Sequence, residues 1–416
     1  MDLKKAGALA LSAVLLAAPA WADGFGVYEW SARGVGMGGA MMFSDEASLM
    51  AYNPAGLTRL KNAEKGQISG AITYIAPRGE ANFYDDDGNQ FLRQHNKNDP
   101  AFVPTLFYAR KVDSNLWFGL GLYPRFGLKA SYDPGWYGRF SNRSADLVTY
   151  SLASTFAWKL TPTLSMGVTA EAMYAGLELT KSAHFLGETP FDVDGDDWGY
   201  GWGIGLDWQA TRKLSLAFLY RSEVKQHLQG DVNLYSAYGT IGTSGDGVVH
   251  LPESFTFGLG WQFDDKTRAE FDAIKTMWSS YEDLTINLKV PSAYSALFGG
   301  LSSYPLSEEK HWRNGWRYQF GLEHQLNDRW TLRCGFVFDE CSSNLSEYAD
   351  YMVPTGIRRT YTIGASYRVK NVEYAFAYGY MTVDDKTIKG AGVNGEDSRT
   401  SNSDSHIISI GARIDL

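Results

Sequence analysis

The sequence lacks long hydrophobic runs, has few cysteines and carries a surplus of negative charge. Beyond residue 22 no apolar run approaches the roughly 18 residues of a membrane-spanning helix, so we expect no helical inner-membrane protein. The two cysteines, Cys334 and Cys341, would lie on the order of 23 Å apart along an extended strand, so we expect no disulfide. The 38 Lys and Arg against 47 Asp and Glu give a net charge of −9, and we expect no nucleic-acid partner.

Motifs for catalysis and cofactor binding are also scarce. The sequence contains neither G-x-S-x-G nor H-E-x-x-H, so a lipase or protease would have to assemble its catalytic set from residues scattered along the chain. Gly34–Gly39 fits G-x-G-x-x-G, but no strand pattern precedes it, which argues against a dinucleotide site. The aspartate run at 192–197 lacks the glutamate that ends a calcium-binding loop. We therefore expect no enzyme, no cofactor and no metal.

The N-terminal residues have the parts of a secretory signal. Two lysines are followed by an apolar run from Leu9 to Ala18 and by Ala20-Trp21-Ala22, an A-x-A cleavage site. Residues 1–22 are therefore predicted to be removed on export, and the mature chain is predicted to begin at Asp23.

Glycine and aromatic residues, by contrast, are abundant, with 44 Gly, 25 Tyr, 22 Phe and 13 Trp among 416 residues. Transmembrane β-barrels use both, because aromatics form belts at the membrane interfaces and glycine allows curvature. The chain also settles into fourteen segments in which apolar and polar residues alternate, as in strands with two unlike faces. These segments are 66–76, 101–111, 115–130, 145–160, 163–182, 197–209, 213–229, 248–263, 266–280, 312–326, 329–341, 357–369, 372–383 and 405–416.

The connections between these segments alternate strictly between two lengths. Six are tight turns, and seven longer polar loops fall between them. Short turns at one end and long loops at the other, with an even strand count, are typical of outer-membrane barrels, whose short turns face the periplasm. The turns are 112–115, 161–163, 210–213, 264–266, 327–329 and 370–371.

The alternation assigns one face of the strands to lipid and the other to the lumen, except in the second segment, whose parity is ambiguous. In the fifth segment Leu164 and Met166 share one face, and Ser165 lies on the other. A β-sandwich core would alternate in the same way, but four tryptophans lie on the apolar face within three residues of a tight turn, as in an interfacial belt. These are Trp158, Trp208, Trp261 and Trp330.

The stretch from Asp23 to Leu60 shows no sustained period of two. It is rich in Gly, Ala, Met and Ser and contains the turn-forming Asn53-Pro54-Ala55-Gly56. A barrel of this width is not filled by its own side chains and would leak if left open. We therefore predict an all-β fold in which residues 63–416 form a fourteen-stranded antiparallel transmembrane β-barrel and residues 23–62 form an N-terminal hatch that plugs it.

Residues of the N-terminal stretch also match a known pattern. They are Gly24, Phe25, Ser31, Gly34, Gly36, Ala40, Asp45, Ala47 and the Asn53-Pro54-Ala55 motif. With the strand layout, they resemble the FadL/TodX family of outer-membrane transporters for hydrophobic compounds. The resemblance implies a hydrophobic capture site near the extracellular loops, a tighter site inside, and sideways release into the membrane through a kink in the third strand.

The third segment carries Tyr123-Pro124-Arg125-Phe126-Gly127, which fits such a kink. Proline cannot donate a ladder hydrogen bond and glycine eases a bend, so Pro124 and Gly127 are the predicted elements of a lateral gate. Asn53, Pro54 and Ala55 are the predicted anchor of the hatch, because proline fixes φ and asparagine caps the local backbone. Phe25 is a candidate ligand contact, with packing against the wall as the alternative.

Two features depart from the family pattern. The connection at 183–196 is short for a loop that helps to build the capture groove, and Leu416 replaces the aromatic residue expected at the end of such barrels. The loop Pro291–Pro305 is unusually apolar, and its apolar side chains are predicted to be exposed and to capture ligand. The capture candidates are Tyr294, Leu297, Phe298 and Leu301.

Charged residues on the lumenal face are candidates for binding a ligand headgroup. The four arginines predicted for this role are Arg268, Arg313, Arg317 and Arg358. They would either receive a carboxylate or pair with acidic residues across strands, and the sequence leaves both alternatives open.

The predicted function is passive uptake of hydrophobic molecules, with long-chain fatty acids as first candidates, across the outer membrane of a Gram-negative bacterium. Aromatic hydrocarbons or alkanes would use the same route. A general porin for small hydrophilic solutes is the alternative of another class, and the long plug argues against it. The expected partners are the fatty acid, outer-membrane lipid and lipopolysaccharide, and the barrel assembly machinery, with the protein itself monomeric.

Overall fold

The computed structural model describes residues 24–61, 63–184, 187–236, 239–343, 345–353 and 356–416. The predicted signal peptide and the predicted start of the mature chain at Asp23 lie outside these residues. In the ranges described, no helix is long and apolar enough to cross a membrane.

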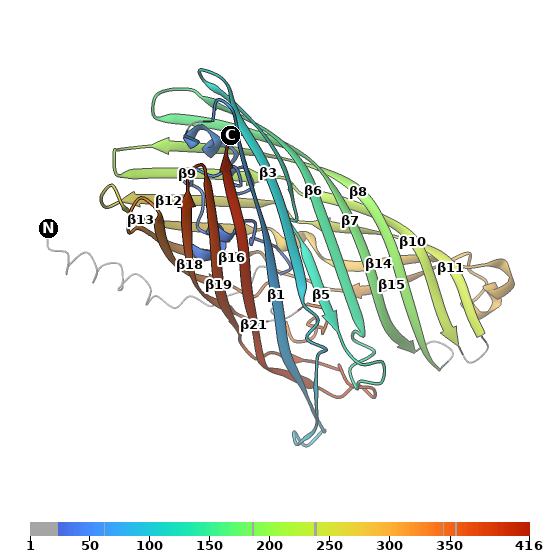
Figure 1. The fold of residues 1–416 in the computed structure, drawn as a ribbon. Coiled ribbons are helices and arrows are strands. Elements are labelled where there is room, and N and C mark those ends of the chain that lie inside the picture. The colour runs from blue at the N-terminus through green and yellow to red at the C-terminus, as the bar shows by residue number, and fades with distance from the viewer. Residues whose placement is uncertain (1–23, 62, 185–186, 237–238, 344, 354–355) are drawn as a thin grey trace.

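The strands form one closed antiparallel barrel of fourteen strands (Figure 1). Each wall strand pairs with the next one along the chain. The first, β1 (Gln67–Tyr84), also pairs with the last, β21 (Ser398–Asp415), over nearly the full length of both, which closes the cylinder. The predicted fold class is thereby confirmed.

The other wall strands follow in chain order. Where one wall strand carries two labels, its hydrogen-bond ladder is interrupted between the two labelled parts. They are β2 (Gln90–His95) with β3 (Ala101–Asp113), β4 (Leu116–Tyr123) with β5 (Gly127–Ser131), β6 (Ser144–Lys159), β7 (Leu164–His184), β8 (Glu188–Gln209), β9 (Leu214–Arg221) with β10 (Val224–Ser236), β11 (Gly239–Leu251) with β12 (Ser254–Gln262), β13 (Thr267–Thr276) with β14 (Asp283–Lys289), β15 (Ser303–Glu309) with β16 (Gly315–Gln325), β17 (Trp330–Asp339), β18 (Arg358–Val369) and β19 (Val372–Val383). The loops add the short elements η3 (Trp278–Ser280), η4 (Ser292–Phe298) and β20 (Thr387–Ile388).

The tight turns form because a short polar side chain accepts hydrogen bonds from the backbone that follows it. The Asp264 carboxylate accepts from the backbone N–H groups of Lys266 and Thr267 at 2.9 and 2.8 Å. Thr161 and Asn327 act in the same way at two other turns. Such side chains stabilise a turn locally, which is why the turns could be predicted from the sequence.

Alternation along each strand separates a lipid-facing side from a lumenal side. In β7 the side chains of Ser165 and Glu171 are buried inside the barrel, whereas Ala170 on the opposite side is exposed. Trp208 and Trp261, next to tight turns, stay exposed on the outer side. The predicted faces are confirmed.

The strands reach further toward the long loops than the alternation predicts. The sequence pattern places a loop at 183–196, but β7 continues to His184 and β8 begins at Glu188. The prediction of a loop there was wrong because aspartate and glycine, which are rare in strands, interrupt the pattern. The alternation nevertheless persists, since Phe191 is buried inside and Asp194 is exposed outside.

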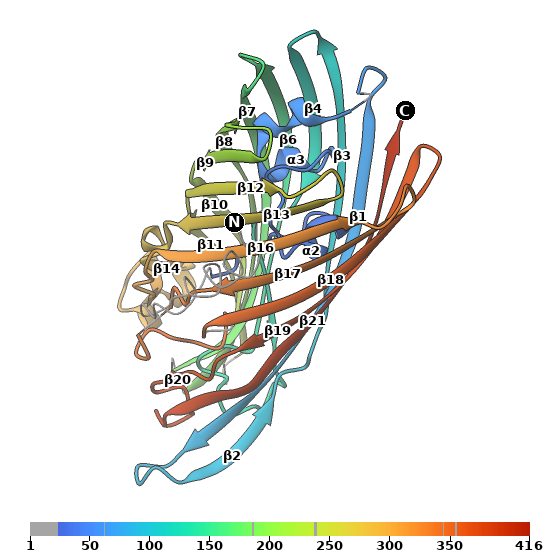
Figure 2. The same cartoon turned by 90° about the vertical axis from the view of Figure 1, so that its left-hand side faces the viewer.

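The segment before β1 folds inside the barrel as three short helices, α2 (Ala32–Gly36), α3 (Leu49–Tyr52) and η2 (Pro54–Arg59) (Figure 2). Ser31 accepts a hydrogen bond at 3.0 Å from the first turn of α2, and Asn53 accepts one at 3.2 Å from the first turn of η2. Nearly all residues of these helices are buried. The segment therefore occupies the place predicted for a hatch.

Candidate functional site

The predicted hatch anchor lies against the inner side of β7 and β8. Two glycines of these strands face it, and a Cβ added to Gly167 would lie 2.4 Å from the backbone N of Ala55. The Asn53 side-chain amide donates to the Leu206 carbonyl oxygen at 3.2 Å. Because these two glycines have no side chains, the backbone of the turn packs directly on the strands. The anchoring role of Asn53-Pro54-Ala55 stays a prediction, and these contacts with β7 and β8 are its physical basis.

Arginine and carboxylate groups fasten the hatch on its periplasmic side. Glu323 of β16 accepts from Arg33 of the hatch at 2.8 Å, and it also pairs with Arg268 at 2.9 Å and with Arg333 at 2.6 Å. These groups line a polar cavity of about 430 Å³. In the same part of the hatch, burial raises the pKa of Glu46 to about 7. Arg268, predicted to hold a headgroup, therefore pairs across strands and lies on the polar side of the hatch.

The first described residues of the hatch reach an apolar part of the lumen. Phe25 is 6 % exposed, and its ring centroid lies 4.6 Å from that of Trp278, 5.8 Å from that of Tyr281 and 5.8 Å from that of Trp312. All three contacts are edge to face, a favoured arrangement of aromatic rings. Inward apolar side chains of β6, β7, β10, β11 and β14 continue this cluster.

The ladder of the barrel wall is interrupted beside Phe25. In the described residues β5 pairs with β6 alone, while β3 pairs with β1 and β4. The ladder between β3 and β4 ends at Leu106 and Leu122. Further along, the backbone N–H of Lys97 donates to the Ser131 carbonyl oxygen at 2.9 Å. Between these two points β3 and β5 share no ladder, and we call this interval the wall gap.

The wall gap is caused by the kink between β4 and β5. The ladder with β6 pairs Tyr123 with Ser151 and resumes at Gly127 with Val148, so three residues lie opposite two. An extra residue on one strand bends that strand, as in a β-bulge. Of the predicted gate residues, Pro124 thus lies in the bend and Gly127 lies at its end. Their role in ligand release stays a prediction.

A cavity of about 210 Å³ extends from Phe25 to the wall gap. Its apolar lining includes Phe25, Leu128 and Ile407. Two of the predicted headgroup arginines also line it. Arg317 donates to Asp339 at 2.9 Å, and Arg358 donates to the Gly24 carbonyl oxygen at 2.7 Å. The structure therefore brings together a predicted ligand contact, a predicted gate and two predicted headgroup residues.

Arg313 is not part of this arrangement. It lies in the loop before β16, its side chain is exposed, and its backbone N–H donates to Ser342 at 2.9 Å. The lumenal face predicted for it was wrong, because the strand begins only at Gly315.

A buried lysine with acidic partners near the aromatic cluster was missed by sequence reasoning. Lys310 is 3 % exposed, and its ammonium lies 2.6 Å from Asp350 and 2.9 Å from Glu308. Burial by itself would lower the pKa of Lys310, but the Asp350 carboxylate outweighs it and raises that pKa above its usual value. Lys181 contacts Glu308 from β7. No local motif marks these residues, because their partners come from separate loops and strands.

The predicted capture residues lie in and just after η4. Tyr294, Leu297 and Leu301 are exposed, with exposed fractions of 37, 43 and 50 %. Phe298 is buried at 5 % and packs edge to face against Tyr304 at 5.5 Å, so the prediction that it is exposed was wrong. One residue of a short helix has to face the protein, and here it is Phe298. The capture role of the other three stays a prediction.

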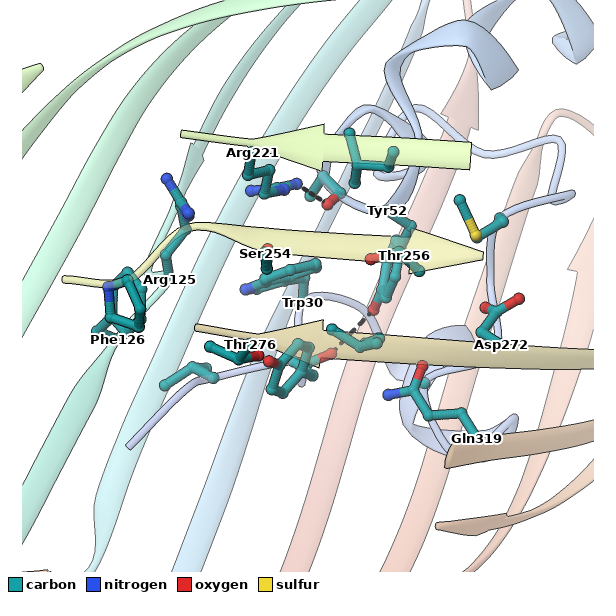
Figure 3. Close-up of a pocket in the computed structure, with 18 residues that line it drawn as sticks. Trp30, Tyr52, Arg125, Phe126, Arg221, Ser254, Thr256, Asp272, Thr276 and Gln319 are labelled. Atoms are coloured by element: carbon teal, nitrogen blue, oxygen red, sulfur yellow. Dashed lines mark hydrogen bonds between the residues drawn. The ribbon is translucent and has the colours of Figure 1, made fainter. Parts of the chain in front are cut away.

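Trp30 of the hatch is a further residue that the sequence reasoning missed. Its indole N–H donates to the Pro124 carbonyl oxygen at 2.5 Å, across 94 positions of sequence. The Arg221 guanidinium lies 5.2 Å over its ring, and the Tyr52 ring packs edge to face against it at 4.9 Å (Figure 3). These side chains line a smaller cavity of about 40 Å³. The one signal in the sequence was a tryptophan within a stretch of mostly small residues.

Comparison with known proteins places this geometry in a family. Residues 13–415 match the family described as outer membrane protein transport protein (OMPP1/FadL/TodX). The chain is 24% identical over 381 residues to the long-chain fatty acid transport protein of Escherichia coli strain K12, which covers 80% of this chain and 82% of that protein. It is 24% identical over 427 residues to outer membrane protein P1 of Haemophilus influenzae strain Rd, with 90% and 89% covered.

Solved structures share the fold. The Pseudomonas aeruginosa FadL homologue superposes with a TM-score of 0.80 at 20% identity, covering 94% of this chain and 100% of that one. The Pseudomonas putida toluene transporter TodX superposes with a TM-score of 0.72 at 16% identity, covering 94% and 99%. The family match spans almost the whole sequence. The chain therefore belongs to the OMPP1/FadL/TodX family and is an outer-membrane β-barrel that transports hydrophobic compounds.

Proposed function

We propose that this protein carries long-chain fatty acids across the outer membrane by passive diffusion, with sideways release into the membrane through the wall gap. The observation that carries the proposal is the cavity beside Phe25, because an apolar lining, two arginines and the wall gap meet there. An apolar tail enters such a cavity by the hydrophobic effect, which is non-directional and lets the ligand slide. Binding followed by diffusion then needs no energy source.

The two arginines favour a ligand with a carboxylate. Guanidinium groups present a planar fork that matches a carboxylate. Arg317 and Arg358 lie 2.9 and 3.9 Å from the same acidic residue, Asp339, and a fatty-acid headgroup would join that carboxylate in contacting them. A hydrocarbon has no group that could use these charges.

Uptake of aromatic hydrocarbons is the second candidate. The aromatic rings around Phe25 favour it, because further rings pack well edge to face against such a cluster. The similarity of the fold to a toluene transporter is a further reason to test it.

We place the first contact of ligand with the protein at the exposed apolar side chains Tyr294, Leu297 and Leu301. A small apolar patch on a loop gives a hydrophobic ligand a weak landing site. The path from there to Phe25 passes the apolar inner faces of β14 and β10. Replacing Leu297 by Ser should then slow uptake at low ligand concentration more than at saturation.

The test is the binding of three ligands to the purified barrel: labelled oleate, its uncharged methyl ester and toluene. We expect saturable oleate binding that weakens about tenfold in Arg358→Gln, the size expected when one charge-assisted hydrogen bond is lost. Methyl oleate affinity should not change in this variant. Arg313→Gln, which alters an exposed arginine outside the cavity, is the matched control and should bind oleate like the wild type.

Two results would contradict the proposal. Saturable toluene binding without oleate binding would favour the second candidate. Equal weakening of oleate and methyl oleate in Arg358→Gln would mean that the arginine shapes the cavity and does not hold a carboxylate. Mass spectrometry of lipids extracted from the purified barrel gives an independent check.

A further inference from the structure

The kink between β4 and β5 leaves several backbone groups without ladder partners. Three residues, Pro124, Arg125 and Phe126, lie opposite only two residues of β6. Buried backbone N–H and C=O groups must find partners, because an unpaired one costs about as much as a lost hydrogen bond. The partners that these groups have in the structure therefore determine whether the kink persists.

Trp30 of the hatch holds one of these groups and connects both edges of the wall gap. Its indole N–H donates to the Pro124 carbonyl oxygen at 2.5 Å, on the kinked strand. Its own carbonyl oxygen accepts from the Thr105 hydroxyl at 2.8 Å, on β3. The side chain is 5 % exposed, and its ring packs against Tyr52 of the hatch and Tyr123 of the wall, with centroids 4.9 and 5.6 Å away. A single hatch residue thus touches the two strands that fail to pair.

Thr149 of β6 holds the second part of the kink. Its hydroxyl accepts from the Phe126 backbone N–H at 3.1 Å and donates to the Phe126 carbonyl oxygen at 2.6 Å. One side-chain hydroxyl therefore takes the place of both ladder bonds that a paired backbone would supply at this point. The residue is 1 % exposed, so water does not compete for these bonds.

The start of the hatch supplies the remaining partners. The backbone N–H of Val27 donates to the Arg125 carbonyl oxygen at 2.9 Å, and that of Gly127 donates to the Phe25 carbonyl oxygen at 3.0 Å. These bonds occupy a side of the kinked strand that β3 would use in a continuous sheet. The Arg125 side chain is paired with Glu171, and both are buried.

We propose that Trp30 and Thr149 are positioning residues that keep the wall gap open by satisfying the backbone of the kink in place of a β-ladder. Without them, the kinked strand gains its missing hydrogen bonds by straightening against the open edge of β3, because an unpaired strand edge is a template for pairing. The wall gap then closes, and ligand stays in the cavity. The inference rests on the proposed lateral release and adds the residues that maintain it.

The test removes each hydrogen bond by replacing the side chain with an apolar one of related shape. Trp30→Phe lacks the indole N–H, and Thr149→Val lacks the hydroxyl. Hydrogen–deuterium exchange of residues 98–105 and 127–131 should slow about fivefold in both variants, the population shift that one hydrogen bond supplies. Oleate uptake by cells should fall by a similar factor while oleate binding to the purified barrel stays unchanged. Thr149→Ser, which keeps the hydroxyl, should restore both properties.

Matched controls are available in the same strands. Trp117→Phe alters a buried tryptophan of β4 whose indole N–H has no hydrogen-bond partner in the described structure. Thr155→Val removes a hydroxyl from the same face of β6, where it pairs with Thr169 at 2.7 Å. Both controls should exchange and take up oleate like the wild type.

Faster exchange in Trp30→Phe and Thr149→Val would mean that the two side chains only stabilise the fold, and unchanged exchange would mean that they do not hold the gap. Either result overturns the proposal. Exchange needs no ligand, so it separates this inference from the proposed function. A wild type that neither binds nor takes up oleate, with exchange as expected, contradicts the fatty-acid proposal alone.

Discussion

The periplasmic half and the extracellular half of the lumen are formed by the same strands but have different chemistry. Along the inward side of β7, Ser165 and Glu171 are followed by Met173, Leu177 and Leu179. The change occurs beside the kink, since Glu171 pairs with Arg125. The first half surrounds the hatch helices with ion pairs, backbone contacts and an apolar cluster that joins Met50 and Leu57 to Phe107 of the wall, and the second surrounds Phe25 mainly with apolar side chains.

This difference separates two tasks of the lumen. Ion pairs and hydrogen bonds are directional and hold a protein segment in one position, at a large cost if one partner is removed. Apolar contacts are non-directional, so they hold a ligand without fixing its orientation. A plugged barrel that passes hydrophobic molecules needs both. Here the network around Glu323 lies at the hatch helices, and the apolar cluster around Phe25 lies at another level of the lumen. The predictions below test that separation.

The largest effect is expected from Glu323→Gln in the polar half. This carboxylate pairs with Arg33, Arg268 and Arg333, so its loss removes the buried carboxylate that these three cations share. Among the described residues, each cation then keeps only one other acidic partner, which is Asp45, Glu270 or Glu373. We expect a destabilisation of about 3 to 5 kcal/mol, concentrated in the hatch. Ion conductance through the barrel in a planar bilayer should rise, because a loosened plug admits water.

Glu64→Gln is the control for this change, because the Glu64 side chain is 69% exposed and its single ion pair at 3.7 Å is worth little. A Glu323→Gln barrel that conducts no more than the Glu64→Gln barrel would show that the hatch does not depend on this network.

A smaller effect is expected from Gly167→Ala at the hatch anchor. The added methyl group would lie 2.4 Å from backbone atoms of Pro54 and Ala55, which cannot turn aside as a flexible side chain would. Overpacking of this kind costs about 1 to 3 kcal/mol. Protease susceptibility of the hatch should increase. In Gly176→Ala on the same strand the nearest atom is 3.4 Å away, and susceptibility should stay at the wild-type level.

The smallest effect is expected from Leu177→Met in the apolar half. The two side chains have similar volume, and such swaps cost less than about 1.5 kcal/mol. Because the contacts there are non-directional, oleate uptake should match that of the wild type. Leu177→Asn, of similar size but polar, should reduce uptake. A strong loss of uptake in Leu177→Met would indicate that the apolar half recognises ligand shape as strictly as the polar half holds the hatch.

The residues of the site were predictable to different degrees. Phe25, Arg317 and Arg358 were named from strand parity and from the hatch motif, and they line one cavity. Arg268 also faces the lumen, but it lies at the level of the polar network. The alternation along a strand predicts which side of the wall a residue faces and not how far along the barrel axis it lies. The sequence could not have linked Trp30 to the kink, since that contact depends on how the hatch packs inside the barrel.

The sequence by itself determined the strand number, the two faces of nearly all strands, the turns and the presence of a plug, because a period of two and short turn-forming side chains act over a few residues. The tertiary structure alone decided which lumenal arginines meet which carboxylates, where β3 and β5 separate, and that Trp30 and Thr149 hold the kink. Those contacts depend on the stagger between strands and on the seat of the hatch, which are set only when the barrel closes.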